Sequence, residues 1–427
     1  MEWPITLAAI TLVTLLILSV PIGVAIGSSV VVAVMVGDLP AEFLMQKLVL
    51  SLDSFPLLAV PFFVLSGEIM QKGSMAQSLL AFSKCLVGHI RGGLAHVSIL
   101  TSMFYGALSG SAPATVAAVG GIMIPAMEKE GYSKDFASAV NTASGCLGVM
   151  IPPSVPLIIY GTTANVSVGD LFIGGIFPGI FPGIFIGLLL MVASYIVAWR
   201  TQTGNKGARA PWRETLAAFS RAKYALVVPV IVLGGIYGGI TTPTEAGAIA
   251  VTYAFITEGL ILKTLTWKGV VDIFKSSCLT TASIFIVVAT ASALGQLLMI
   301  YNVPDLIVEL LSGLTGNKYI LLTAIIVLLL IMGTFMDALA NILILTPLLQ
   351  PLVMAAGIDM THFGIIMIVA VSIGFLTPPV GVNLFVACGI SGVSIERLSV
   401  AVLPFVGVMI VGLLVLAFVP QLSLFLL

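Results

Sequence analysis

The sequence predicts an all-α polytopic membrane protein built from inverted structural repeats, with two helical hairpins and two broken helices. Three observations predict this class. Of the 427 residues, 59% are hydrophobic and only 8% are charged, so the chain cannot form the water-facing surface of a soluble protein. Its apolar runs are either long enough to cross a bilayer or about half that length. One half of the chain also aligns with the other.

Composition excludes several functions. The net charge is −1, which leaves no basic face for nucleic acid. The chain has three histidines, four widely spaced cysteines and no P-loop, HExxH or GxSxG motif. We therefore expect buried thiols, and neither an enzyme nor a partner of nucleic acid.

Spanning segments are predicted wherever an apolar run approaches the roughly 20 helical residues that a bilayer core requires. The first run is too long for a signal-peptide core and lacks a basic leading region, so we expect it in the mature protein. The long runs are Ile5–Val36, Phe55–Met70, Leu171–Trp199, Tyr224–Ile240, Ala246–Leu262, Leu279–Ile300, Tyr319–Met336 and Leu398–Val419.

The two halves align at an offset of 226 residues. This offset places Leu147–Pro153 (LGVMIPP) on Ile373–Pro379 (IGFLTPP), and Gly131 on Gly357. We expect a first repeat over 1–200, a basic cytoplasmic linker over 201–223 and a second repeat over 224–427.

Positive charge predicts the orientation of each half. Arg200–Lys223 is rich in Lys and Arg, with Glu214 its single acidic residue, and basic loops favour the cytoplasm. Counting crossings from there places Lys72–Arg91 and Lys263–Lys275 inside, but Gly357–His362 outside. The repeats are therefore predicted to be inverted, as in many secondary transporters.

Each repeat is predicted to hold one hairpin and one broken helix. The hairpins are expected over 94–127 and 319–356; the first tip, Tyr105–Thr115, is rich in small and hydroxyl residues, and the second tip is Gly333–Asn341. The broken helices are expected over 135–161 and 363–390, each interrupted by Pro-Pro. Polar segments at Ser74–His89 and 304–314 are too short to span and are expected to lie along the interface as amphipathic arms.

The hairpin tips and helix breaks predict cation sites. Asp337 is expected deep in the membrane with no Lys or Arg near it in sequence, so a bound cation is its simplest partner. Proline frees backbone carbonyls, which together with the hydroxyls of Ser109, Ser111, Ser154 and Thr377 could hold sodium. Helix N-termini at the tips also suit an anionic substrate.

Close helix packing is the alternative explanation for the small residues. It is favoured at the GxxxG pairs Gly23–Gly27, Gly106–Gly110, Gly179–Gly183 and Gly235–Gly239. At the hairpin tips, ion or substrate contact is favoured because the tips pair with double prolines in both repeats.

At these residues the chain resembles the large membrane (permease) subunit of tripartite ATP-independent periplasmic (TRAP) transporters. The resemblance covers the whole length. Its segments are Ser109–Thr115 with Ile124–Met127, Gly148–Ser154 with Ile159–Gly161, Gly238–Ala246 and Gly374–Asn383.

The resemblance implies sodium-driven uptake of an organic acid across a bacterial inner membrane by an elevator mechanism. It also implies two partners, a small four-helix membrane subunit and a periplasmic substrate-binding protein. Carried over by residue, the first cation site is Ser109, Gly110, Ser111 and Ser154, the second is Asp337, Thr377, Pro378 and Gly381, and the substrate contacts are Thr115, Asn341 and Asn383.

The substrate stays open between sialic acid, other sugar acids and C4-dicarboxylates. The start of the chain at its first membrane run, without a fused small subunit, inclines the expectation towards sialic acid. Two other functions remain as alternatives: a channel without ion coupling, and a self-sufficient sodium/dicarboxylate carrier that needs no binding protein.

Overall fold

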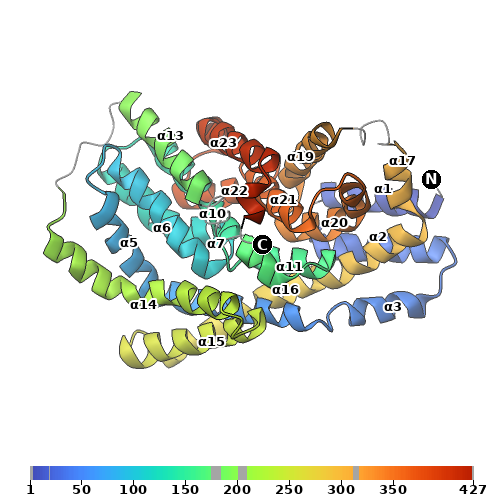
Figure 1. Ribbon diagram of the computed structural model, residues 1–427, viewed down its shortest axis with the longest axis horizontal. Helices are drawn as coiled ribbons and strands as arrows, with labels where there is room; N and C mark the ends of the chain where they lie inside the picture. Colours follow the sequence, from blue (N-terminus) through green and yellow to red (C-terminus); the bar gives the residue numbers. More distant parts are fainter. Residues whose placement is uncertain (1–2, 19, 175–183, 201–208, 311–316, 426–427) are drawn as a thin grey trace.

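The computed structural model describes residues 3–18, 20–174, 184–200, 209–310 and 317–425. Every regular element in these ranges is a helix, which confirms the all-α prediction. Five of these helices are long and apolar enough to cross a membrane, or six if the bent pair Lys134–Met150 and Val155–Ala164 is one span. Figure 1 shows a lower row containing α14, α16 and α3, with the hairpins and broken helices above it.

The N-terminal apolar run Ile5–Val36 is divided between two helices. It forms two helices that pack against each other, α1 (Trp3–Ile17) and α2 (Ile22–Val36). Pro21 is the N-cap of α2, and proline ends a helix because it lacks a backbone donor and restricts the residue before it. The short helix α3 (Ala41–Leu50) follows.

Small residues bring α2 against the long helix α16 (Trp267–Ile300). A Cβ added at Gly23 would lie 2.8 Å from Ile286 Cγ2, and one at Gly27 would lie 3.1 Å from Thr290 Cγ2. The packing role predicted for this glycine pair is therefore confirmed, whereas Gly179–Gly183 lies outside the described residues. Helix α4 (Ala59–Lys72), which follows the short turn η1 (Phe55–Leu58), packs against both α16 and α15.

Two successive helical segments occupy residues 94–127, where the first hairpin is predicted. Another helix precedes them, over the segment that is predicted to be an amphipathic arm. The elements are α5 (Met75–Val87), α6 (Gly93–Ser109), α7 (Ala112–Thr115), η2 (Val116–Gly120) and α8 (Gly121–Lys129).

The broken helix of the first half follows directly. Its two segments bend by 44° at Ile151–Ser154. The elements are α9 (Lys134–Gly145), α10 (Leu147–Met150), α11 (Val155–Ala164) and then α12 (Val168–Gly174).

The connection between the halves is partly helical. The run Leu171–Trp199 ends in α13 (Ile186–Arg200), with 175–183 outside the described residues. Of the predicted linker 201–223, residues 201–208 are also outside, and α14 (Trp212–Tyr237) begins within it, so that part is not a loop. The capping box of α15 (Pro243–Phe255) sits in the TPTEA motif, with Thr242 and Glu245 as its partners, and η4 (Ile256–Ile261) continues this helix.

The second half repeats the order of arm, hairpin and broken helix. Of the arm expected over 304–314, residues 311–314 are outside the described part. The elements are α17 (Val303–Leu310), α19 (Lys318–Phe335), α20 (Ala338–Ala355), α21 (Met360–Gly374), α22 (Val382–Ser391), α23 (Ile395–Phe418) and α24 (Gln421–Leu424).

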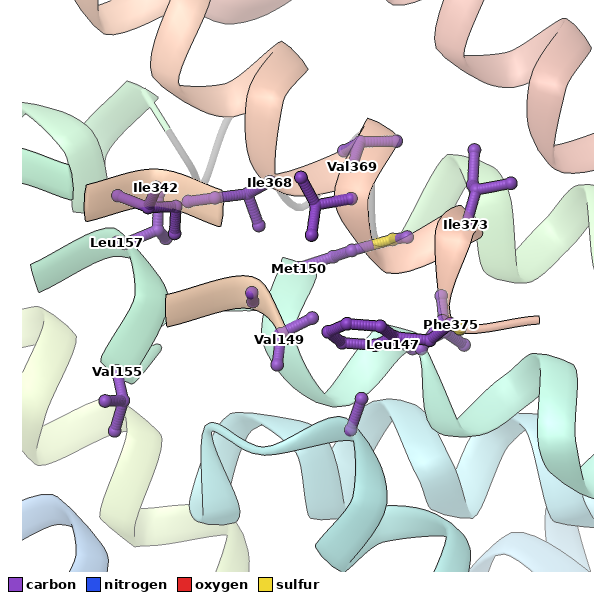
Figure 2. Packing of buried hydrophobic residues seen from close by; sticks show 14 of the residues in the cluster. Leu147, Val149, Met150, Val155, Leu157, Ile342, Ile368, Val369, Ile373 and Phe375 are labelled. Atoms are coloured by element: carbon purple, nitrogen blue, oxygen red, sulfur yellow. The ribbon is translucent and has the colours of Figure 1, made fainter. Parts of the chain in front are cut away.

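The two broken helices meet in the buried interior of the protein. Every residue of α21 from Thr361 to Gly374 is buried, and α10 is buried throughout. Figure 2 shows Met150 reaching from α10 towards Val369, with Leu147 beside Phe375. This core fixes the two breaks relative to each other and so positions the residues described next.

Candidate functional site

Three hydroxyl groups hold the tip of the first hairpin. Ser111 is the N-cap of α7 and its Oγ accepts from the backbone N–H of Ala114 at 3.5 Å. Thr115 Oγ1 donates to the carbonyl of Ser111 at 2.8 Å and lies 3.1 Å from Ser109 Oγ. The structure thus brings together two predicted cation ligands and one predicted substrate contact.

Gly110 lets this tip touch the first helix break. Its φ is +59°, and a Cβ there would lie 3.1 Å from the carbonyl oxygen of Pro153 and 3.2 Å from the nitrogen of Val155. A side chain would meet both the left-handed backbone penalty and this contact. Ser154 is fully buried in the break, and its hydroxyl donates to the carbonyl of Val149 at 2.7 Å.

Asp337 holds the tip of the second hairpin in the same way as Ser111 holds the first. It is the N-cap of α20, and its Oδ1 accepts from the N–H of Ala340 at 2.9 Å. Asn341 Nδ2 donates to the carbonyl of Asp337 at 2.9 Å and to that of Met336 at 3.1 Å. Asn341 Oδ1 is buried without a hydrogen-bond partner among the described residues.

The second break is also joined to its hairpin, through the N–H of Val380, which donates to the carbonyl of Thr334 at 3.0 Å. Gly381 caps α22 with φ +51°, and a Cβ there would lie 3.2 Å from the carbonyl oxygen of Thr377. Pro378 is exposed, whereas the first break is buried throughout. The two predicted cation regions therefore differ in exposure.

Both hairpin tips face one cavity of about 320 Å³, which we call the hairpin cavity. Ser109, Gly110, Ser111 and Asp337 all line it. The structure therefore places Asp337 with the first predicted cation group. The remaining predicted site residues do not line this cavity: Thr115, Ser154, Asn341, Thr377, Pro378, Gly381 and Asn383.

Asn383 lies instead between the two broken helices. Its Nδ2 donates to the carbonyl of Thr142 at 3.5 Å and to Cys146 Sγ at 3.4 Å. Its Oδ1 is buried and has no partner within the described part of the chain. In this structure the residue supports the crossing of the two helices.

The far wall of the hairpin cavity comes from α4 and α16, and the sequence did not identify it. Glu68 and Gln71 of α4 and Thr280 of α16 line this wall. The sequence places Glu68 four residues before Lys72, a spacing that favours an ion pair at the helix end, but the structure does not form it: Glu68 Oε1 accepts from Ser276 Oγ at 3.0 Å. The i,i+4 spacing suggested a local partner, but the side chain turns to a helix about 200 residues away.

Tyr105 is a further cavity residue that the sequence did not identify. It lies in α6 one turn before the hairpin tip and is 1% exposed. Its hydroxyl has no hydrogen-bond partner among the described residues. A buried phenol normally finds a partner, so this group is available to a bound solute.

The charges of the hairpin cavity are one-sided. Asp337 and Glu68 contribute carboxylates, and no Lys, Arg or His of the described chain lines the cavity. A carboxylate held away from bulk water is costly unless it is paired or binds a cation. The cavity therefore favours cations and repels an anion that enters it alone.

Comparisons with known proteins agree with this architecture. The family model described as "Tripartite ATP-independent periplasmic transporter, DctM component" matches residues 9–422. An isethionate TRAP transporter permease protein DctMQ of Oleidesulfovibrio alaskensis is 44% identical over 96% of this chain and 64% of its own length. The chain thus spans somewhat less than two thirds of that relative.

Two further relatives match this chain over most of their own length. The C4-dicarboxylate TRAP transporter large permease protein DctM of Vibrio cholerae is 36% identical over 98% of this chain and 96% of its own. The sialic acid permease protein SiaM of the same organism is 37% identical over 90% and 89%.

The fold is also similar to that of a solved transporter. The Alcanivorax borkumensis YdaH transporter has a TM-score of 0.63 and 16% identity, and the match covers 89% of each chain. The extent of the family match and the identity to these permeases show that the chain belongs to the DctM component family of tripartite ATP-independent periplasmic transporters, which are multi-pass membrane proteins.

Proposed function

We propose that this protein is the large permease of a sodium-coupled importer that takes up an organic acid across a bacterial inner membrane. The observation that carries the proposal is the hairpin cavity, where the N-caps Ser111 and Asp337 of the two hairpins face one space that no basic residue of the described ranges lines. Sodium coupling accounts for this arrangement because it supplies the missing positive charge.

Sodium would be held by hard oxygen ligands, which this cavity provides. They are the carboxylate of Asp337 and the hydroxyls of Ser109 and Ser111. Thr377, Pro378 and Gly381 are proposed for a second ion at the other break. Neutralisation of Asp337 lowers the repulsion that a negatively charged substrate would meet, and this couples the binding of the ion to that of the acid.

An elevator movement fits the composition of the cavity walls. The hairpins and broken helices form one wall, and α4 and α16 form the other. If the first group slides past the second, it carries the bound acid and sodium with it while the two tips stay together. The burial of the first break and its contact with Gly110 support movement of these elements as a unit.

Two partners are proposed: a small four-helix membrane subunit and a periplasmic binding protein that delivers the acid. The relatives are named for transport of isethionate, C4-dicarboxylates or sialic acid, and we propose that the substrate is an acid of this kind.

Uptake into proteoliposomes tests this function. The chain is reconstituted with its small subunit, and uptake of isethionate, succinate and sialic acid is measured with and without a sodium gradient and with and without the binding protein. We expect uptake of one acid to require both. Uptake that is indifferent to sodium would refute the coupling, and uptake without the binding protein would instead indicate a self-sufficient carrier.

A further inference from the structure

A second cavity lies between the same two groups of helices, and we call it the outer cavity. Its volume is about 310 Å³. Lys47 and Ser54 line it from α3 and the loop that follows, Ser292 and Gln296 from α16, and Asn165 from the end of α11. The basic segment Arg200–Lys223 is predicted to be cytoplasmic, and the apolar run Leu171–Trp199 separates it from Asn165, so Asn165 is expected outside the cell.

The outer cavity is separate from the hairpin cavity. Helix α16 lines both: Thr280 faces the hairpin cavity, and Gln296 faces the outer one. These two residues are on the order of 20 Å apart along the helix axis. A solute coming from outside would meet the outer cavity first.

The charge of the outer cavity is opposite to that of the hairpin cavity. Lys47 is its one charged lining residue in the described chain, and no carboxylate lines it. Lys47 has no ion pair, since the described residues hold a single one, between Arg397 and Asp135. Its ammonium is therefore free to bind an anion.

Several neutral donors accompany this lysine. The side chains of Ser54, Ser292 and Gln296 make no hydrogen bond with any described residue, so their donors remain free. The hydroxyls of Thr162 and Thr163 differ, because both already donate to the carbonyl of Ile159, at 2.9 and 2.7 Å. An ammonium with free hydroxyl and amide donors and no carboxylate is the chemistry that recognises a carboxylate or sulfonate.

We propose that the outer cavity is an anion-binding vestibule, in which Lys47 holds the carboxylate or sulfonate of the incoming substrate before it enters the hairpin cavity. This inference rests on the proposed import of an organic acid. It accounts for how an anion approaches a permease whose deeper cavity carries two carboxylates. The vestibule concentrates the acid without needing sodium, and the hairpin cavity accepts it only with sodium.

Thiol protection tests this vestibule without relying on transport. Thr162→Cys, at a lining residue whose hydroxyl is already bonded within its own helix, is introduced into a chain in which the exposed Cys278 is replaced by Ser, and its reaction with a membrane-impermeant thiol reagent is followed. Isethionate, succinate and sialic acid are each added without sodium. We expect at least one acid to slow the reaction, and Lys47→Gln to abolish the protection. The matched control is Lys268→Gln, because Lys268 is exposed and lines neither cavity.

Transport kinetics give a second readout. Lys47→Gln is expected to raise KM about tenfold with little change in kcat, because one charge-assisted hydrogen bond is lost. Protection that is absent, or that persists in Lys47→Gln, would overturn the proposal. A raised KM of Lys47→Gln that appears only with the binding protein, and without thiol protection, would also overturn it, because Lys47 would then contact the binding protein and not the substrate. If no acid is transported but one protects, the proposed function fails and the vestibule stands.

Discussion

The thiol of Cys146 donates to the backbone carbonyl of Ser372 across 3.0 Å, and the two residues are 226 positions apart. This is the offset that superimposes the two Pro-Pro breaks, so each residue contacts its own counterpart in the other repeat. A point that meets its counterpart must lie close to the axis that relates the two repeats. The crossing of α10 and α21 is therefore the centre of the internal symmetry, and the hairpin tips lie on either side of it.

Asp337→Asn is predicted to remove the sodium dependence of uptake and to leave the fold intact. Asparagine caps a helix about as well as aspartate, so the bond from Ala340 N–H is retained while the charge is lost. Uptake at varied sodium concentrations and the melting temperature in detergent measure the two effects. The matched control is Asp359→Asn, which alters an N-cap aspartate of α21 outside the hairpin cavity. An unchanged sodium response in Asp337→Asn would remove this residue from the ion site.

Tyr105→Phe is predicted to raise KM without loss of stability. Tyr105 lines the hairpin cavity and its buried hydroxyl has no partner among the described residues, so its removal takes no internal hydrogen bond away. Tyr160→Phe is the control with the opposite outcome: its hydroxyl donates to the carbonyl of Met360 at 2.6 Å, so we expect about 1 kcal/mol of lost stability. A KM identical to that of the wild type would show that Tyr105 does not contact the substrate.

Gly148→Ala is predicted to disrupt the first hairpin tip. A Cβ at this position would lie 2.3 Å from Thr115 Oγ1 and 2.7 Å from the carbonyl oxygen of Ser111, and the backbone atom cannot move without moving the tip. We expect a lower melting temperature and at least a tenfold loss of uptake, by roughly 1.4 kcal/mol or more. Gly121→Ala, which meets no atom within 4 Å, should keep both properties. Wild-type uptake by Gly148→Ala would refute the tight fit of this tip.

Glu258→Gln is predicted to loosen the arm helix α5. This fully buried carboxylate accepts from the N–H groups of Ser74 at 2.8 Å and Met75 at 2.9 Å. It also accepts from the Thr264 hydroxyl. An amide replaces one acceptor oxygen with a donor that would face these donors, so a loss of about 1–3 kcal/mol is expected. Proteolysis near residue 74 and thermal melting measure it, with the exposed Glu42→Gln as control; equal melting of both variants would contradict it.

Local chemistry explains why the membrane-embedded architecture could be predicted from the sequence. The Gly-Ser-Pro clusters at Ser109–Thr115 and the two Pro-Pro pairs interrupt helices because of their own backbone properties, wherever they lie in the fold. Pro21 acts in the same local way within the apolar run Ile5–Val36, where it separates α1 from α2. Asp337 could be found because a carboxylate in apolar sequence stands out by itself.

The residues that line each cavity are set by which helices, distant in the sequence, pack together. Glu68 had a plausible partner at Lys72, but it bonds to Ser276 because α4 packs against α16. No local pattern in the sequence marks Tyr105 or Lys47. Tyr105 is singled out because its buried hydroxyl has no partner among the described residues, and Lys47 because no carboxylate of the described chain lines its cavity.

A membrane-embedded all-α chain with two related halves, two hairpins and two breaks is predictable from the sequence, because composition and the placement of proline and glycine act over a few residues. That Ser111 and Asp337 share one cavity, which α4 and α16 complete, follows from the packing of the whole chain. The same packing places a second cavity of opposite charge further along α16. Contacts between residues far apart in the chain follow from the packing of whole helices, which no local pattern specifies.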